Sequence, residues 1–255
     1  MVFYGLTDVG KVRSNNQDSF RACSLENGAV LAVVCDGMGG AAGGSQASET
    51  ACEAFCELIV QNGKLFFDAE GNLKQKVVRN ALLTAVNKAN TAVYKKALMD
   101  NSLSGMGTTL TACFVYKDVF MSVNVGDSRT YAIYPDHAER VSKDHSYVQA
   151  LVDEGEITEE QAQHHPKKNI ILRAVGIDDS VEADFFTRTA DMDCILLCSD
   201  GLSNYIPDSE LHKFFTASDI KGKTRDLVDF ANLSGGGDNI TAVIIDLKAG
   251  EGSEA

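Results

Sequence analysis

The sequence predicts an α+β fold in which two antiparallel β-sheets pack together and helices cover their outer faces. Three observations support this. Most strand-like segments are short and rich in β-branched residues, a pair of long helices interrupts them only once, and regular strand-helix alternation is missing. The last observation argues against a doubly wound parallel sheet. The 255 residues, 44% of them hydrophobic, are enough for a large core.

The predicted strands are short apolar segments bounded by turn residues. They cover 2–7, 19–24, 29–35, 108–116, 119–125, 129–134, 194–199 and 240–247. Lys117-Asp118 joins two of these segments, which are expected to form an antiparallel hairpin. The sequence does not fix the turn type, because neither residue of this two-residue loop is glycine.

Two long helices are predicted over 45–61 and 74–99, where apolar residues recur every three or four positions. A shorter helix is predicted to begin at Thr158, because Thr158 and Gln161 have the spacing of a capping box. Another helix is expected to run through Leu227, Val228 and Ala231.

The chain is predicted to form one domain over residues 1–247, followed by a polar tail over 248–255. It contains no internal repeat, and none of its three prolines begins a linker. No segment approaches the ~18 apolar residues of a membrane span, and the N-terminus lacks the basic and apolar regions of a signal peptide. We therefore expect a cytoplasmic monomer with no membrane partner.

The net charge of −13, from 23 Lys and Arg against 36 Asp and Glu, excludes a typical duplex-binding surface. Affinity for nucleic acid comes mainly from Lys and Arg that neutralise phosphates, so no nucleic-acid partner is expected. A phosphorylated substrate is still compatible with this charge if bound cations reverse the field locally.

The seven cysteines lie mostly within apolar segments and are predicted to be buried, reduced thiols of a cytosolic protein. Cys52 and Cys56 share a helix face, and Cys194 and Cys198 share a strand face. Neither pair has the CxxC spacing of a zinc site, so structural zinc is disfavoured.

Four short segments place an Asp beside a Gly at the end of a predicted strand. They are Cys35-Asp36-Gly37, Gly126-Asp127-Ser128, Ser199-Asp200-Gly201 and Gly237-Asp238-Asn239. Asp-Gly is also a common turn dipeptide, but its repetition at apolar strands favours carboxylates that converge at one sheet end. Converging carboxylates raise one another's pKa unless a cation lies among them, and oxygen ligands suit Mg²⁺ or Mn²⁺.

The glycine-rich stretch 37–44 suggests a phosphate-binding loop, but two familiar types are disfavoured. It lacks the Gly-Lys-Ser/Thr of a Walker loop. It matches G-x-G-x-x-A, yet the acidic residue that a dinucleotide fold requires would fall within a predicted helix. The polar stretch 7–18 includes Arg13, whose guanidinium is suited to bidentate phosphate binding, although an arginine in such a stretch is, taken alone, more typical of a solvated surface charge.

Six ordered blocks spanning nearly the whole chain resemble the metal-dependent Ser/Thr protein phosphatases of the PPM (type 2C) family, in their compact bacterial form. The blocks are Arg13…Asn16-Gln17-Asp18, Cys35-Asp36-Gly37-Met38-Gly39-Gly40, Gly105-Met106-Gly107-Thr108-Thr109, Val125-Gly126-Asp127-Ser128-Arg129, Ser199-Asp200-Gly201 and Gly237-Asp238-Asn239-Ile240-Thr241. The resemblance implies a central antiparallel β-sandwich flanked by helix pairs on both faces, with a flap at about 145–180 that governs substrate preference.

The resemblance also implies roles for the matched residues. Asp36 would bridge two Mn²⁺ or Mg²⁺ ions, the Gly37 carbonyl would bind the second, and Asp200 and Asp238 would complete the first site. Asp18 would hold water bound near the second ion.

Asp127 would join Asp200 at a weaker third ion, and Arg13 would bind the substrate phosphate. The implied reaction is attack on phosphorus by a hydroxide activated by the two ions, without a phosphoenzyme intermediate.

The sequence departs from the family pattern at the leaving-group acid. Eukaryotic relatives carry a His where this chain has Met38, and some bacterial relatives carry one where it has Ala41. Water bound to a metal ion is therefore the default acid. His145, in a block at the start of the flap, is predicted to be structural rather than catalytic.

The resulting prediction is a protein serine/threonine phosphatase whose partners are phosphoproteins, among them a cognate Ser/Thr kinase and its substrates. Two alternatives stay open: a non-catalytic phosphoprotein- or metal-binding module on the same fold, and a phosphatase of small metabolites. Turnover of an aryl phosphate tests the first, and relative rates on phosphopeptides and metabolites test the second.

Overall fold

The computed structural model describes residues 1–216 and 219–249 and contains two antiparallel sheets. The first sheet is five-stranded, in the order β1 (Val2–Asp8), β11 (Ile240–Asp246), β10 (Cys194–Cys198), β7 (Arg129–Ile133) and β8 (Ala138–Arg140). The second is six-stranded, in the order β2 (Asp18–Ser24), β3 (Val30–Met38), β5 (Leu110–Tyr116), β6 (Val119–Val125) and β9 (Asp184–Thr189), with β4 (Gly107–Thr108) paired to β3.

Alternating side chains explain how the sheets stack into a sandwich. In β3, Leu31 and Val33 contribute to the core beneath the helices, while Ala32 and Val34 contribute to the core between the sheets. Successive side chains of a strand point to opposite faces. An apolar strand without polar alternation is therefore buried on both sides, as a layer in the middle of the molecule must be.

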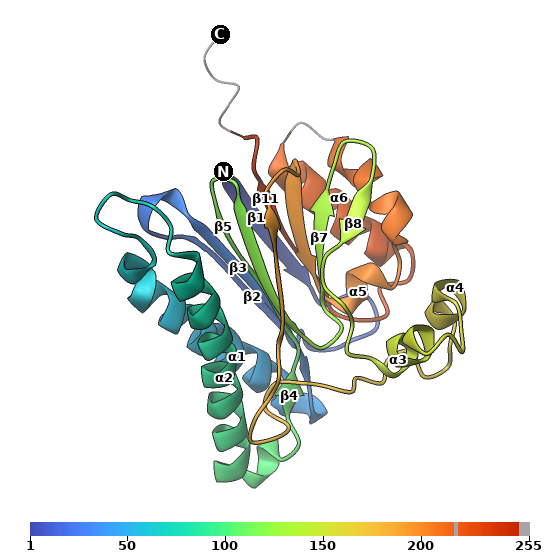
Figure 1. Ribbon diagram of the computed structural model, residues 1–255. Helices are drawn as coiled ribbons and strands as arrows, with labels where there is room; N and C mark the ends of the chain where they lie inside the picture. Colours follow the sequence, from blue (N-terminus) through green and yellow to red (C-terminus); the bar gives the residue numbers. More distant parts are fainter. Residues whose placement is uncertain (217–218, 250–255) are drawn as a thin grey trace.

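Helices form the outer layers, as Figure 1 shows. The long helices α1 (Gly40–Asn62) and α2 (Gln75–Met99) cover the second sheet. On the first sheet lie α6 (Ile220–Leu233), the short α5 (Asp200–Ser203) and a 3-10 segment over Asp208–Thr216. The predicted α-β-β-α class is confirmed, with one long helix and shorter segments forming the second outer layer.

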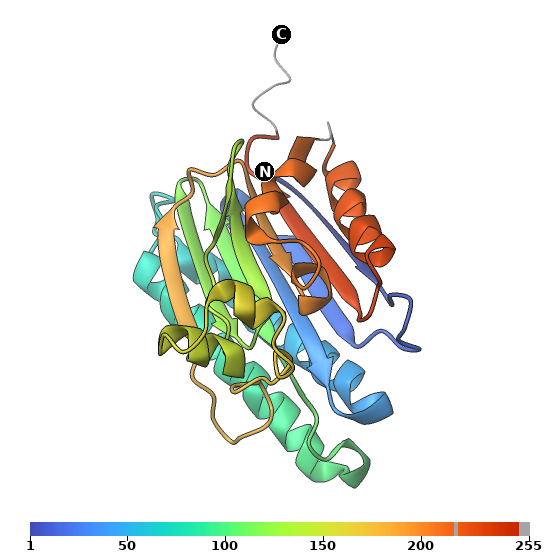
Figure 2. The same ribbon diagram turned by 90° about the vertical axis from the view of Figure 1, so that its right-hand side faces the viewer.

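The predicted flap region carries α3 (Tyr147–Asp153) and α4 (Glu159–Gln163). Figures 1 and 2 show both helices projecting from the sandwich beside α5. The predicted capping box is present at α4, where Thr158 and Gln161 bond reciprocally. None of the helices within residues 1–216 and 219–249 has the length and hydrophobicity needed to cross a membrane.

Most predicted elements are present, and the differences have physical causes. Helix α1 begins at Gly40 instead of residue 45. Glycine is a poor helix former, but a side chain on Gly44 would come within 2.7 Å of Gln17, so close packing requires glycine there. The hairpin of β5 and β6 forms with Lys117 at a φ of 51° in place of a glycine. Strands β8 and β9 were not predicted, because they are half-exposed strands of mixed polarity.

The prediction that the cysteines are buried is confirmed only in part. Five of them are buried, but Cys23 and Cys56 are half-buried. Of the predicted tail, residues 250–255 lie outside the described residues.

Candidate active site

Residues from both sheets line one cleft, of about 470 Å³, at an end of the sandwich. Among the residues that line it are Arg13, Asp36, Gly37, Asp127, Asp200 and Asp238. Six of the seven predicted site residues therefore meet at one place. The seventh, Asp18, lies buried beside them and faces Asp36 across the pairing of β2 with β3.

Asp36 and Gly37 are positioned by the last part of β3, whose preceding residues are fully buried. The Asp36 N–H donates to Thr109 Oγ1 at 2.9 Å, and the Asp36 carbonyl accepts from the Thr109 N–H at 2.9 Å. The Gly37 N–H donates to the Gln17 carbonyl at 3.1 Å. A Cβ on Gly37 would lie 2.0 Å from the Gly44 carbonyl oxygen, so only glycine fits at this strand end.

Asp200 and Asp238 come from the first sheet. Asp200 follows β10 and begins α5, whereas Asp238 lies two residues before β11. The prediction that all four Asp-Gly sites terminate apolar strands is therefore wrong for Asp238. The two carboxylates still meet because β10 and β11 are antiparallel, which places the end of one strand beside the start of the other.

Asn239 holds the N-terminal loop against this start of β11. Its side-chain oxygen accepts from the Gln17 N–H, and its Nδ2 donates to the carbonyls of Val9 and Asn15. Asn239 lies in one of the six sequence blocks that carry the family resemblance, but the sequence gave no signal for this role. These contacts bring Arg13, which from its sequence context alone is typical of a solvated surface charge, to the rim of the cleft.

Asp127 lies in the turn between β6 and β7 and is 7% exposed. The preceding Gly126 has a φ of 99°, a conformation that glycine adopts readily. Ser128, which follows, bonds through its hydroxyl to Thr109 Oγ1 at 2.7 Å. Thr109 therefore links the backbone of Asp36 to the turn that carries Asp127.

The electrostatics of the cleft disfavour ionised carboxylates when no cation is near. Burial raises the pKa of Asp18 to about 7. Burial, together with repulsion from Asp18 and Asp200, raises the pKa of Asp36 well above its ordinary value. Burial and repulsion from Asp200 do the same for Asp127, and burial and Asp238 raise the pKa of Asp200. Each raised pKa reports negative charge that is inadequately compensated.

The donor set fits hard cations. Asp18 Oδ1, Asp127 Oδ1 and Asp200 Oδ1 are buried and have no hydrogen-bond partner among the described residues. Buried oxygens without partners are costly, and carboxylate and carbonyl oxygens are the ligands that Mg²⁺ and Mn²⁺ prefer. As the side chains stand, no three His, Cys, Asp or Glu groups in the described ranges enclose an ion site. The Asp36 and Asp200 carboxylates are nevertheless near enough for the charge of Asp200 to raise the pKa of Asp36.

Arg13 supplies the positive charge at the rim of the cleft. Its Nη2 donates to Asp238 Oδ2 at 2.9 Å, and its side chain is 54% exposed. The bond to Asp238 raises the pKa of Arg13. A guanidinium with this exposure keeps donors free for phosphate oxygens.

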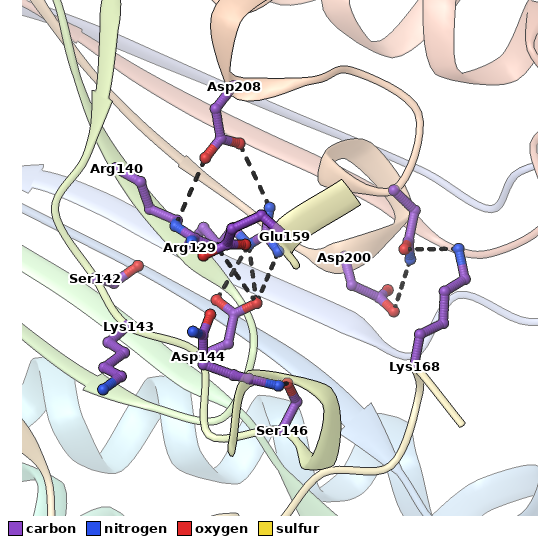
Figure 3. Close-up of polar contacts among 12 residues, drawn as sticks. Arg129, Arg140, Ser142, Lys143, Asp144, Ser146, Glu159, Lys168, Asp200 and Asp208 are labelled. Carbon is purple, nitrogen blue, oxygen red and sulfur yellow. Dashed lines mark hydrogen bonds and ion pairs between the residues drawn. The ribbon is translucent and has the colours of Figure 1, made fainter. Parts of the chain in front are cut away.

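A second cavity, of about 370 Å³, lies between the flap helices and the segment after α5, and it shares Asp127, Asn169 and Asp200 with the cleft. Lys168 Nζ of the flap donates to Asn204 Oδ1 at 3.1 Å, and Asn204 Nδ2 donates to Asp200 Oδ2 at 3.1 Å. Figure 3 shows Lys168 and Asp200 on the two sides of this contact. Arg129 forks onto Asp144 in the same view. The sequence gave no signal for the Lys168–Asn204 contact.

Taken together, acidic groups that favour divalent cations and an arginine at the rim define a metal-dependent hydrolase of phosphate esters. The comparisons identify the family. The sequence profile described as protein phosphatase 2C matches residues 10–227. The chain belongs to this family, whose members are metal-dependent.

The chain is similar to curated bacterial proteins over nearly its full length. It is 34% identical to the serine/threonine phosphatase Stp of Listeria innocua, covering 94% of this chain and 93% of that protein. It is 34% identical to the protein phosphatase PhpP of Streptococcus pneumoniae, covering 95% of this chain and 96% of that protein.

Solved structures show the same fold. The serine/threonine phosphatase Stp1 from Staphylococcus aureus superimposes with a TM-score of 0.86 at 31% identity, covering 96% of this chain and 94% of that one. The catalytic domain of the phosphatase PstP in complex with two manganese ions gives a TM-score of 0.81 at 33% identity, covering 96% and 97%.

Proposed function

We propose that this protein hydrolyses phosphoserine and phosphothreonine esters of proteins by direct transfer of the phosphoryl group to water, with two Mn²⁺ or Mg²⁺ ions held in the cleft. The observation that carries the proposal is the convergence of Asp36, Asp127, Asp200 and Asp238 on one cleft, with unpartnered buried oxygens among them. The names of the bacterial relatives support the substrate class.

The residues are assigned as follows. Asp36 would contribute to both ions, the Gly37 carbonyl to the second, and Asp200 and Asp238 to the first. Asp18 would act near the second ion through water. When bound, the ions lower the pKa of water and neutralise charge on the phosphoryl oxygens.

Asp127, with Asp200, would provide a weaker third position for an ion. That ion would serve the leaving group, because this chain has Met38 where eukaryotic relatives carry a histidine. Arg13 exchanges its contact with Asp238 for the phosphate, which it holds by a forked pair of hydrogen bonds.

The side chains around the cleft favour water as the nucleophile. No histidine, cysteine or lysine is among the described residues that line it. The aspartates of the cleft are the side chains left that can form a covalent phosphoryl intermediate, and the assignment above commits them to the cations. We therefore propose that no phosphoenzyme forms, and that the acidic groups of the cleft act by binding cations.

We further propose that the substrates are phosphoproteins produced by a cognate Ser/Thr kinase, that the flap over 145–180 selects among them, and that the protein acts in the cytoplasm as a monomer. The flap helices border a cavity that shares Asp127, Asn169 and Asp200 with the cleft, which supports a role for them in contacting the residues that flank a phosphoserine.

The test is metal-dependent turnover of a phosphoserine peptide. Activity should require Mn²⁺ or Mg²⁺ and disappear in excess EDTA. Asp36→Asn and Asp238→Asn should each lower kcat by several orders of magnitude, because each removes charge from a ligand. Asp226→Asn, on the exposed face of α6, is the matched control and should leave kcat unchanged.

Three results would contradict the proposal. Undiminished hydrolysis in EDTA would exclude the role of the ions. Binding of a phosphopeptide without turnover would indicate a non-catalytic module. Faster turnover of small phosphorylated metabolites than of phosphopeptides would indicate a metabolite phosphatase.

A further inference from the structure

His145 lies behind the turn that carries Asp127 and contacts it through both its backbone and its side chain. It follows β8, and its side chain is only 9% exposed. Its backbone N–H donates to the Gly126 carbonyl at 2.9 Å, and its carbonyl accepts from the Leu172 N–H at 2.7 Å. His145 thus joins the Gly126–Asp127 turn to the part of the flap that contains Leu172.

The imidazole makes a second contact with the same turn. The Gly126 N–H donates to His145 Nδ1 at 3.2 Å. A ring nitrogen that accepts this bond carries no proton, so the neutral ring must carry its proton on Nε2. Gly126 is therefore held at both its N–H and its carbonyl by a single residue.

Two charged side chains lie on the far side of the ring. Nε2 lies 3.3 Å from Asp184 Oδ2, an acceptor suited to its N–H. Arg173 Nη1 lies 3.1 Å from Nε2 but donates to Asp184 Oδ1 and to the Glu182 carbonyl. Asp184 is therefore oriented by Arg173 and in turn orients the ring. Burial and the Arg173 charge lower the pKa of His145, which keeps the ring neutral.

Other contacts hold the same turn from its remaining sides. Gly126 has a φ of 99°, and a Cβ there would lie 2.6 Å from the Thr109 side chain. On the side of β5, the Thr109 and Ser128 hydroxyls hold the turn. On the opposite side, Asn124 Nδ2 donates to the Gly126 carbonyl at 3.2 Å and to the Lys143 carbonyl at 3.0 Å. His145 is the contact that reaches the Gly126 N–H.

We propose that His145 is a positioning residue that holds the Gly126–Asp127 turn, and through it the Asp127 carboxylate, against the catalytic cleft. Asp184 and Arg173 lie against the opposite edge of the ring. The functional part of the proposal rests on the role of Asp127 proposed above. The positional part does not, since it concerns the hydrogen bond from the Gly126 N–H to the ring.

The first test is amide hydrogen exchange at Gly126, measured by NMR on the full chain with Mg²⁺. His145→Leu removes the acceptor and keeps an apolar side chain of similar size. Exchange at Gly126 should become about tenfold faster, the factor expected for the loss of one hydrogen bond. His145→Asn places Oδ1 where Nδ1 was and should stay within about threefold of wild type. The Leu196 amide in β10 is the control for global unfolding.

The second test separates positioning from a general structural role. His145→Leu should lower kcat on a phosphoserine peptide about tenfold with little change in KM, and His145→Asn should restore most of it. In the Asp127→Ala background, adding His145→Leu should cause no further loss. Asp184→Asn, which removes the partner of Nε2, should reproduce part of the effect and serves if His145→Leu does not fold.

Unchanged Gly126 exchange in His145→Leu would overturn the proposal. Equal losses of kcat in the wild-type and Asp127→Ala backgrounds would also overturn it, because His145 would then act elsewhere. A wild-type protein without phosphatase activity would refute the proposed function, and the exchange experiment would still decide whether His145 holds the turn.

Discussion

At the scale of single residues, the cleft depends on polar contacts that join the two sheets. Asp18 of the second sheet is 8% exposed, and its Oδ2 accepts from Ser199 Oγ and from Thr241 Oγ1, each at 2.7 Å. Ser199 directly follows β10 and Thr241 lies in β11, so both donors come from the side of the first sheet. Two hydroxyl donors on one oxygen hold this carboxylate in place and leave its other oxygen without a partner.

Arg13 is expected to act on substrate affinity. Arg13→Ala should raise KM for phosphopeptides by roughly tenfold to a hundredfold, because a forked contact between charged groups is worth roughly 1.5–3 kcal/mol. Arg13→Lys should recover only part, since an ammonium is a point donor. Steady-state kinetics with calorimetric metal counts would test this. Unchanged kinetics in Arg13→Ala would show that the arginine is only a surface charge.

Asp127 is expected to act on the leaving group and not on stability. Asp127→Ala should leave the melting temperature near that of wild type and lower kcat more on a phosphoserine peptide than on p-nitrophenyl phosphate. The serine alkoxide is a poor leaving group that needs a proton, whereas p-nitrophenolate leaves readily. The measurement is kcat on both substrates. Equal losses on both would contradict the leaving-group role.

At the scale of elements, the outer helix α6 is fixed to β11 by burial and by one ion pair. Leu227, Val228 and Ala231 are buried against the first sheet. Lys223 Nζ lies 3.0 Å from Asp246 Oδ2, and the two side chains are 12% and 14% exposed. Burial alone would raise the pKa of Asp246, but the hydrogen bonds from Lys223 and from nearby backbone N–H groups hold it below its ordinary value.

The Lys223–Asp246 pair should stabilise the protein at neutral pH and not in acid. A carboxyl with a lowered folded-state pKa contributes stability above its unfolded pKa of about 4, and this is lost as the pH falls through the folded value. Asp246→Asn should therefore cost about 1 kcal/mol at pH 7, a figure reduced for partial solvent screening. The cost should shrink toward pH 3. Urea unfolding at both pH values measures it, and a cost that grows in acid would contradict the assignment.

At the scale of the whole molecule, the core between the sheets makes the two halves one unit. Val34 and Phe120 of the second sheet share this core with Ile195, Leu197 and Val243 of the first. The active-site carboxylates come from both sheets. The cleft can therefore exist only when the sheets are packed together. The single domain over 1–247 stays a prediction.

The two sheets should unfold together. Ile195 is fully buried between them, and Ile195→Ala should destabilise the protein by about 2–5 kcal/mol while leaving one cooperative transition. Calorimetry, with a comparison of calorimetric and van't Hoff enthalpies, would measure this. Two resolved transitions in wild type would indicate that the sheets are separate domains.

Local pattern was enough to predict much of this protein. Helical periodicity located α1 and α2, apolar β-branched segments located the central strands, and Thr158 with Gln161 marked the start of α4. These features depend on residues close in sequence. The Asp-Gly repetition likewise indicated that carboxylates would gather, because strand ends on one side of a sandwich lie together.

Only the tertiary structure decided which distant groups meet. It showed that Asp238 begins a strand instead of ending one, and that Asp18 accepts from Ser199 and Thr241. It formed β9 at the sheet edge, where pairing with β6 outweighs a mixed sequence pattern. It also placed His145 between Gly126 and Asp184. Such contacts join residues far apart in the chain, so no local pattern records them, and they form only when the packing of both sheets fixes the backbone.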